Sequence, residues 1–411
     1  MGSASLIQLS AVGVENIGLT VQASHSYWKQ MFAKHTAFAM EPKELPFQGG
    51  TANYGSRKAT VQIERSGDLV ARMYLVFDLT ALAGDGATYT DRDARFTNDI
   101  GRALIEEVKL TIGAVTYDTR QGEYYHIWEE LSKNKEKHLN RLTGKSSNVN
   151  DLFDWGTGVQ KIYVPIDFYY TENYGVALPL VSLFQHNTVL EFMFRQKSSL
   201  IIAAAGSGYT VSTETGGLIE NMVVLCEYIF LENHERNFFV RSSHKYQIEQ
   251  VQYLGTTSVP TGSSTFNVNI QFNHPTKELI WVFRKKANVT ALEWFNFTGE
   301  EVEDDAFLSM RILLNSSERF SARDPHYFRQ IQPHQHHSAI PEKHIYTYSF
   351  ALFPEAYASS GSVNFSRIDT AQMRFIFTTA IADPNGFEFH LWGRSINFSR
   401  VERGMSKLFF A

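Results

Sequence analysis

The sequence predicts an all-β protein made of two tandem β-sandwiches, and three observations support this fold class. Aromatic residues make up 14% of the 411 residues, with 31 Phe and 19 Tyr. Aromatic and β-branched side chains suit pleated, half-buried surfaces. Short alternating segments bounded by turn residues recur along the whole chain. In addition, one arrangement of strands occurs twice at a spacing of almost half the chain.

The repeated arrangement is an aromatic strand, a long polar excursion and a second alternating strand. The first copy opens at Ile162-Tyr163 and closes at 190–194 (LEFMF), and the second opens at Ile345-Tyr346 and closes at 373–377 (MRFIF). The difference between 162 and 345 equals that between 190 and 373, which is 183, so we expect no net insertion between the copies. Solenoid units recur every 20–50 residues or so, and a longer repeat indicates duplication of a whole domain.

In the first half, turn signals such as 66–68 (SGD) and 113–114 (GA) separate the alternating runs. The strands expected there are 58–66, 69–79, 105–112, 115–119, 161–170, 189–195 and 223–231. Between 121 and 141 the alternation stops and the charged run 133–137 (KNKEK) follows, which predicts one short helix with a solvated tail. The Gly-rich segments 83–98 and 203–217 predict exposed loops.

The second half repeats this rhythm. Its expected strands are 246–253, 265–272, 278–283, 345–352, 373–378 and 387–391. The polar stretch 232–244 predicts a linker turn, which divides the chain into an N-terminal arm (1–25), a first domain (26–235) and a second domain (236–411). Around sixteen short strands with one or two short helices fit two eight-stranded sandwiches, and sandwiches with long end loops are commonly jelly rolls.

Composition excludes several classes of function. The net charge of −5 gives no reason to expect nucleic-acid binding, which needs clustered basic charge. Cys226 is the only cysteine, so no intrachain disulfide can form and a reducing compartment is expected. Because Cys226 lies in the strand-like run 223–230, it is expected to be a small buried hydrophobe. The longest purely apolar run, 200–205, is too short to cross a bilayer.

Short segments from residue 34 to residue 369 resemble the major capsid proteins of large eukaryotic double-stranded DNA viruses, the iridovirus, phycodnavirus and mimivirus-like group. They are 34–41 (KHTAFAME), 66–70 (SGDLV), 105–108 (IEEV), 122–124 (GEY), 177–183 (ALPLVSL), 348–352 (YSFAL) and 360–369 (SGSVNFSRID). The last is the most specific, and the order and spacing of all of them carry the resemblance. The chain departs from the family pattern at 405–411, which lacks the family's Gly-rich tail.

The resemblance implies a double jelly-roll structural protein that is not an enzyme and has no catalytic residue, cofactor or metal. It implies homotrimers that form pseudo-hexameric capsomers and tile an icosahedral virion shell assembled in the host cytoplasm. The implied partners are other copies, neighbouring capsomers, and minor capsid and penton proteins, without direct nucleic acid. The arm (1–25) would lie on the inner side, near an internal membrane, and the segments 203–217 and 321–342 are candidates for outer loops.

Other interpretations stay open from the residues alone. The chain could be a minor capsid paralogue or a virophage-type capsid protein. It could be a glycan-binding double β-sandwich. It could also be a bicupin-like metalloenzyme, in which His334 and His336 on one strand, with Glu342, hold a metal. The simpler interpretation of these histidines is a polar loop between Pro333 and Pro341. The acidic run 300–305 could hold calcium, or could be a solvated loop.

Overall fold

The computed structural model describes residues 3–30, 32–49, 52–83, 93–132, 139–146, 148–156, 158–204, 209–299, 304–377 and 386–410. The chain forms two compact units, Met1–Ala37 and Phe38–Ala411. The first unit holds the helices α1 (Ser3–Ser10) and α2 (Ile17–Thr20), joined by a 3₁₀ turn (Val14–Asn16), and none of these elements has a buried residue. Its large apolar side chains face solvent: Leu6, Ile7, Leu9, Val12, Val14, Ile17, Leu19, Val21, Tyr27, Trp28 and Phe32.

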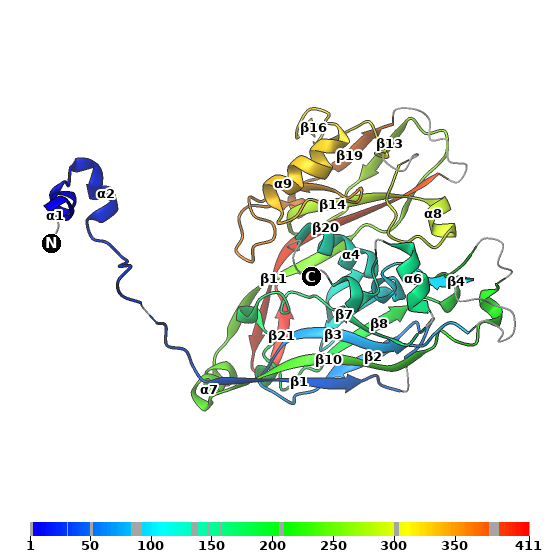
Figure 1. Ribbon diagram of the computed structural model, residues 1–411, viewed down its shortest axis with the longest axis horizontal. Helices are drawn as coiled ribbons and strands as arrows, with labels where there is room; N and C mark the ends of the chain where they lie inside the picture. The colour runs from blue at the N-terminus through cyan, green and yellow to red at the C-terminus, as the bar shows by residue number, and fades with distance from the viewer. Residues whose placement is uncertain are drawn as a thin grey trace. The chain divides into compact units, whose positions relative to one another are not determined.

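The first half of the second unit is a sandwich of two four-stranded antiparallel sheets (Figure 1). One sheet has the order β1 (Phe38–Pro46), β10 (Ile219–Leu231), β3 (Leu69–Leu79) and β7 (Gln160–Pro165). The other has the order β2 (Ala59–Ile63), β8 (Thr188–Phe194), β5 (Ile105–Ile112) and β6 (Val115–Gln121). A short pair, β4 (Ala94–Phe96) with β9 (Ile201–Ala203), lies outside these two sheets.

The second half repeats this topology strand for strand. One sheet has the order β11 (His244–Tyr253), β20 (Phe387–Glu402), β14 (Pro275–Lys285) and β17 (Tyr346–Ser349). The other has the order β13 (Thr265–Asn269), β19 (Ala371–Ile376), β15 (Ser309–Leu314) and β16 (Ser317–Glu318). The additional strands β12 (Thr257–Val259), β18 (Val363–Asn364) and β21 (Met405–Leu408) extend the first of these sheets. The predicted double jelly roll is confirmed, because in both halves the eight strands enter the two sheets in the same sequence.

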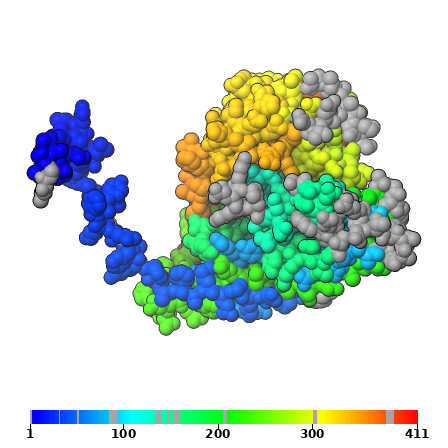
Figure 2. Space-filling model, in the orientation of Figure 1, coloured from blue at the N-terminus to red at the C-terminus, as the bar shows by residue number. Residues whose placement is uncertain are grey.

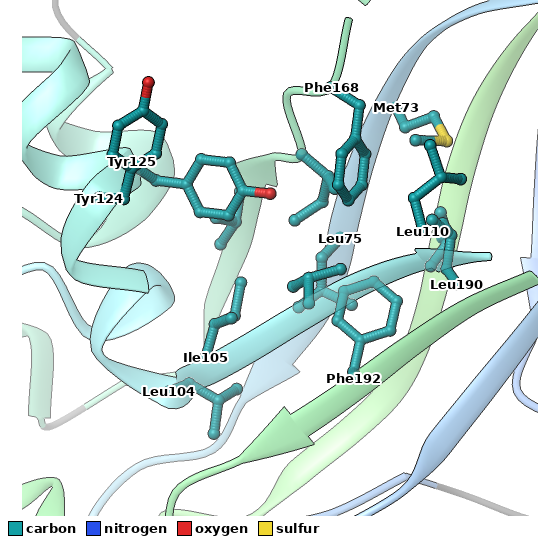
Figure 3. Close-up of a cluster of buried hydrophobic side chains, with 14 of the residues drawn as sticks. Met73, Leu75, Leu104, Ile105, Leu110, Tyr124, Tyr125, Phe168, Leu190 and Phe192 are labelled. Atoms are coloured by element: carbon teal, nitrogen blue, oxygen red, sulfur yellow. The ribbon is translucent and has the colours of Figure 1, made fainter. Parts of the chain in front are cut away.

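Alternating side chains fill each sandwich. In β8 every second residue is buried. Its Leu190 and Phe192 share one apolar cluster with Leu110 of the neighbouring strand β5 and Leu75 of β3 in the facing sheet (Figure 3). The second core is richer in phenylalanine: the rings of Phe283, Phe375 and Phe389 lie 5.0–5.4 Å apart and meet edge-on or tilted. Such ring pairs stabilise a core beyond the area that they bury.

The repeat that the sequence predicts is correct at one end and shifted at the other. Leu190 and Met373 both face their own cores, as the spacing of 183 requires. Ile162, however, pairs with Phe77 and faces the first core, whereas Ile345 packs against the first half and Tyr346 faces the second core. Because successive strand residues point to opposite faces, the equivalence of Ile162 with Ile345 is wrong by one residue.

The helices of the second unit are short. They are α3 (Ile100–Leu104), α4 (Gly122–Ser132), α5 (Asn140–Thr143), α6 (Val149–Gly156), α7 (Asn233–Arg241), α8 (Lys286–Thr290) and α9 (Gln332–His336), which continues a π-helical turn (Tyr327–Ile331). Single 3₁₀ turns lie at Tyr174–Val176, Leu180–Ser182, Lys197–Ser199, Val211–Thr213 and Phe365–Arg367. The described residues thus hold more helices than the one or two predicted.

The helix predicted within 121–141 is confirmed as α4, and its charged tail 133–137 lies outside the described residues. The linker turn predicted at 232–244 is wrong, since α7 occupies most of it. Gly122 allows β6 to turn directly into α4, because a Cβ at this position would lie 2.2 Å from the carbonyl oxygen of Arg102. No helix in the described ranges is long and apolar enough to span a membrane.

We expect Phe192→Ala to lower the free energy of unfolding by about 3–5 kcal/mol, because Phe192 is 1% exposed and its removal leaves a cavity between the sheets. Chemical denaturation at one fixed protein concentration measures this change. The matched control is Phe410→Ala, because Phe410 is 55% exposed and should cost far less. Equal losses in the two variants would contradict the assigned core.

Candidate functional site: the joint between the two jelly rolls

The histidines that the sequence singles out as metal ligands do not form the expected pair. His334 and His336 lie on the helix α9, not on a strand, and residues two apart on a helix point to different sides. His334 is exposed, and Nδ1 of His336 lies 3.0 Å from the carbonyl oxygen of Leu352. Among the described residues no group of three His, Cys, Asp or Glu side chains could hold a metal ion. The strand geometry assumed for the bicupin-like interpretation is therefore wrong.

Of the three histidines at 334, 336 and 337, His337 is the one whose side chain is fully buried. Its Nε2 forms an ion pair of 2.9 Å with Glu278 on β14, and its Nδ1 lies 3.1 Å from Oε1 of Glu355. Burial alone would lower the pKa of His337, but the charges of Glu278 and Glu355 outweigh burial and raise it to about 9. Burial raises the pKa of Glu278, but His337 and Arg394 outweigh this and lower it to about 2. At neutral pH the pair is therefore ionised.

This pair belongs to a larger ionic cluster around Arg394 on β20. The Arg394 guanidinium, 2% exposed, donates to Glu278 at 3.0 Å and also pairs with Glu249 on β11. The guanidinium carbon Cζ of Arg394 lies 3.7 Å from the ring centroid of Trp128, which belongs to α4 of the first half. A desolvated cation over an indole face is held by the ring quadrupole. The cluster therefore ties the helix of the first jelly roll to a sheet of the second.

A second ionic cluster between the two halves is centred on Glu123, in the first turn of α4. Arg195, the residue after β8, donates to Glu123 at 2.5 Å, and Arg284 of β14 lies 3.4 Å from the same oxygen. Arg284 also donates to Glu388 of β20 at 2.9 Å. The Trp294 ring lies near both guanidinium groups, at 4.3 Å from Arg195 and 5.3 Å from Arg284. Two cations from different halves are thus held together by one carboxylate and one indole.

A third polar contact joins α4 to the segment before β17. Nδ1 of His126 lies 2.6 Å from Asp99, and its Nε2 lies 2.8 Å from Nζ of Lys343. Burial and the Lys343 charge lower the pKa of His126 to about 3, against the opposing effect of Asp99. The neutral ring can therefore donate from Nδ1 to Asp99 and accept from Lys343 at Nε2. Phe295 stacks on this ring at 4.1 Å.

Apolar contacts fill the space between these clusters. Ile280, Val282 and Trp392 project from the outer face of the sheet β11-β20-β14-β17 and belong to the core cluster of the first half. The indole nitrogen of Trp392 donates to Gln121 on β6 at 3.1 Å. We use "the joint" for this surface, in which β6 and α4 of the first half cover the outer face of the second half's sheet. The joint fixes the angle between the two jelly rolls.

The other sequence candidates have structural roles. Residues 300–303 of the acidic run lie outside the described residues, and Asp305 accepts from the Tyr346 hydroxyl at 2.9 Å. Asp68, in the SGD turn, accepts from the backbone of Leu231 and pairs with Arg236. The prediction that Cys226 is buried is confirmed, and burial raises the pKa of its thiol to about 12. A thiol with so high a pKa is a poor nucleophile at neutral pH.

Sequence reasoning did not find the residues of the joint. Trp128, Arg284 and Arg394 stand in segments whose local pattern resembles any half-buried helix or strand. A weak signal was present in β20, where the run 390–395 (HLWGRS) places charged and polar residues between apolar ones on a strand that is buried on both faces. Such buried charges need partners, and only the packing of the two halves shows where the partners lie.

The raised pKa of His337 predicts a loss of stability at alkaline pH. Its folded-state pKa of about 9 exceeds the ordinary 6.5, so its contribution is complete below pH 6.5 and is lost as the pH rises through about 9. We expect His337→Gln to show a smaller fall in unfolding free energy between these two pH values than the unsubstituted protein. His334→Gln is the control, because this side chain is exposed on the same helix. Parallel pH profiles for His337→Gln and the unsubstituted protein would contradict the assignment.

Comparison with known proteins agrees with this architecture. Residues 26–232 match the family described as "Major capsid protein N-terminus", and residues 235–406 match "Large eukaryotic DNA virus major capsid protein". The chain is 31% identical to the major capsid protein of Paramecium bursaria Chlorella virus 1, covering 92% of this chain and 88% of that protein. It is 28% identical to the major capsid protein of Phaeocystis pouchetii virus, covering 99% of both.

Solved structures agree with the fold. A structure of PBCV-1 VP54, described as fitted into a reconstruction of the virophage Sputnik, superposes with a TM-score of 0.76 at 26% identity, covering 94% of this chain and 100% of that chain. The Faustovirus major capsid protein shares the fold with a TM-score of 0.73 at 13% identity, covering 96% of each chain. The chain belongs to the major capsid protein family of the large eukaryotic DNA viruses.

Proposed function

We propose that three copies of this capsid protein associate into a pseudo-hexameric capsomer and that capsomers tile an icosahedral virion shell. The observation that carries this proposal is the strand-for-strand match between the two jelly rolls. Three copies contain six similar sandwiches, and a three-fold ring of six similar units has an almost hexagonal outline. Hexagonal blocks fill a flat facet without gaps.

The joint supports this role, because a building block must keep its shape. The joint carries buried ion pairs, three cation–aromatic contacts and a cluster of apolar side chains. Removing one partner of a buried ion pair typically lowers the free energy of unfolding by about 3–5 kcal/mol. Sliding one jelly roll over the other would separate several such pairs and would therefore be unfavourable. The two halves therefore act as one rigid body of fixed angle.

The same ionic clusters support a structural role and not catalysis. The buried carboxylates and cations of the joint neutralise one another across the two halves. We therefore propose no catalytic residue, cofactor or metal for this chain. We also propose the division predicted from the sequence, with a first domain at 26–235 and a second at 236–411.

The exposed apolar side chains of the N-terminal unit, Met1–Ala37, support the proposal that this chain has further partners within the virion. Its apolar side chains, such as Leu9, Leu19 and Trp28, are 77–97% exposed, and exposed apolar surface of this extent marks a contact region. We place the arm (1–25) on the inner side of the shell, near minor capsid proteins or an internal membrane. Neighbouring capsomers and penton proteins complete the set of partners, nucleic acid is not contacted directly, and assembly takes place in the host cytoplasm.

We expect the purified chain to form a trimer at micromolar concentration, since permanent assemblies often bury ~2,000 Å² or more per contact. Native mass spectrometry measures the number of subunits, and electron microscopy of the same sample should show rings with a hexagonal outline. A monomer under these conditions would contradict the proposed capsomer.

A further inference from the structure

The two equivalent sheets differ in how their outer faces are covered. In β14 of the second half the outward residues Glu278, Ile280, Val282 and Arg284 are 0–4% exposed, because the first half covers them at the joint. In β3 of the first half, a strand of the same length at the same place in its sheet, only Val76 of the equivalent outward residues is buried. Arg72 is exposed, and Tyr74 and Asp78 are half-buried.

The neighbouring central strand shows the same difference. Trp392 pairs with Ile280 on the covered sheet and is 1% exposed. Leu225 pairs with Tyr74 on the other sheet and is half-buried, as is Val223 two residues before it. Tyr163 on β7 and the exposed Lys161 continue the same face. We call this surface the open face: it has an apolar centre and a charged rim, which is the usual composition of a protein interface.

The second half also contains a counterpart of the helix that makes the joint. α4 lies between β6 and β7 and is buried along its length. Between the equivalent strands β16 and β17 stands the helical segment Tyr327–His336. Its residues Gln330, Ile331, His334 and Gln335 are exposed, and their spacing places them on one side of the helix.

A rigid apolar loop adjoins this helix. Leu352 and Phe353 are 64% and 63% exposed, although their backbone is firmly held. His336 lies 3.0 Å from the carbonyl oxygen of Leu352, and the carbonyl oxygen of Pro354, two residues further on, accepts from Lys277 and Arg394 at 3.2 Å. Apolar side chains on a pre-ordered loop bind at a low entropic cost. We call Ile331, His334, Leu352 and Phe353 the knob.

The knob belongs to the second half of each copy and the open face to the first half. In the unit Phe38–Ala411, α9 lies at the end carrying β13, β16 and β19, and β1 and β10 lie at the opposite end (Figure 1). In the space-filling view the strand β1, in blue, runs along the surface at that opposite end (Figure 2). Two different surfaces of one body that fit each other make head-to-tail contacts between copies, and such contacts form a ring when their rotation closes.

We propose that the knob of one copy packs on the open face of the next copy, and that this contact repeats between subunits the joint found within each subunit. The proposal rests on the capsomer proposed above and identifies the surfaces that join its subunits. Around the ring, internal joints would alternate with these intersubunit contacts, so that all six sheets have their outer faces covered.

The test uses two variants, each damaged on one surface. The knob variant carries Ile331→Asp with Phe353→Asp, and the face variant carries Tyr74→Asp with Leu225→Asp. Truncated or charged contact residues at the centre of an interface weaken it by about tenfold or more. Each variant alone should therefore be a monomer at a concentration at which the unsubstituted protein is a trimer. A variant with Leu142→Asp and Val149→Asp, which are exposed on α5 and α6, is the control and should remain a trimer.

Mixing the two variants gives the decisive result. The knob variant keeps an intact open face and the face variant keeps an intact knob, so an equimolar mixture should form heterodimers with one undamaged contact and no trimers. Native mass spectrometry distinguishes these species. Folded variants that both stay trimeric, or whose mixture stays monomeric, would overturn the inference while the capsomer stands. An unsubstituted chain that is itself monomeric would overturn both.

A measurement without substitutions covers the case in which a variant fails to fold. Lys161 lies on the rim of the open face, and Lys58 immediately precedes β2. Both residues are exposed in the single chain. Amine labelling of the unsubstituted trimer should modify Lys161 several-fold more slowly than Lys58. Equal labelling of the two lysines would overturn the inference.

Discussion

The structure depends on the burial of charged groups between the two jelly rolls. Arg394 is held by Glu249, Glu278 and the face of Trp128, and Arg284 is held by Glu123 and Glu388. Each of these charges would be costly to bury alone, so each is tolerable only when the two halves sit at one relative position. Apolar packing by itself allows several similar arrangements, and the ionic contacts select one of them.

A fixed angle between two similar sandwiches is what a shell subunit needs. If the internal joint set a different angle from the contacts between copies, a ring of six sandwiches would not close. In the capsomer proposed above, the sandwiches would supply similar edges, the joint would supply the rotation from one to the next, and a three-fold ring would use that rotation three times. The family membership and the geometry therefore agree on a structural role in the capsid, in which the buried charged groups hold the two jelly rolls at one relative position.

The sequence was informative wherever one strand face is buried. Alternation predicted the strands 189–195 and 373–378, which the structure places at Thr188–Phe194 and Ala371–Ile376, because a half-buried strand must place every second side chain in the core. It was less informative where burial is two-sided. β20 runs for 16 residues, from Phe387 to Glu402, but only 387–391 were expected, since a strand covered on both faces loses its alternation. The same two-sided burial explains the one-residue error at Ile345.

By itself the sequence determined the class of the protein: two sandwiches, a buried Cys226, a short helix after residue 121, and the family that the ordered segments resemble. These features depend on local periodicity or on short strings of residues. Only the tertiary structure decided which charges meet, that His337 and not His334 or His336 is buried, and which of two equivalent sheet faces stays open. Those outcomes depend on contacts between separate elements, such as Arg284 and Glu123, which are 161 residues apart in the chain, and no local pattern encodes which elements will meet.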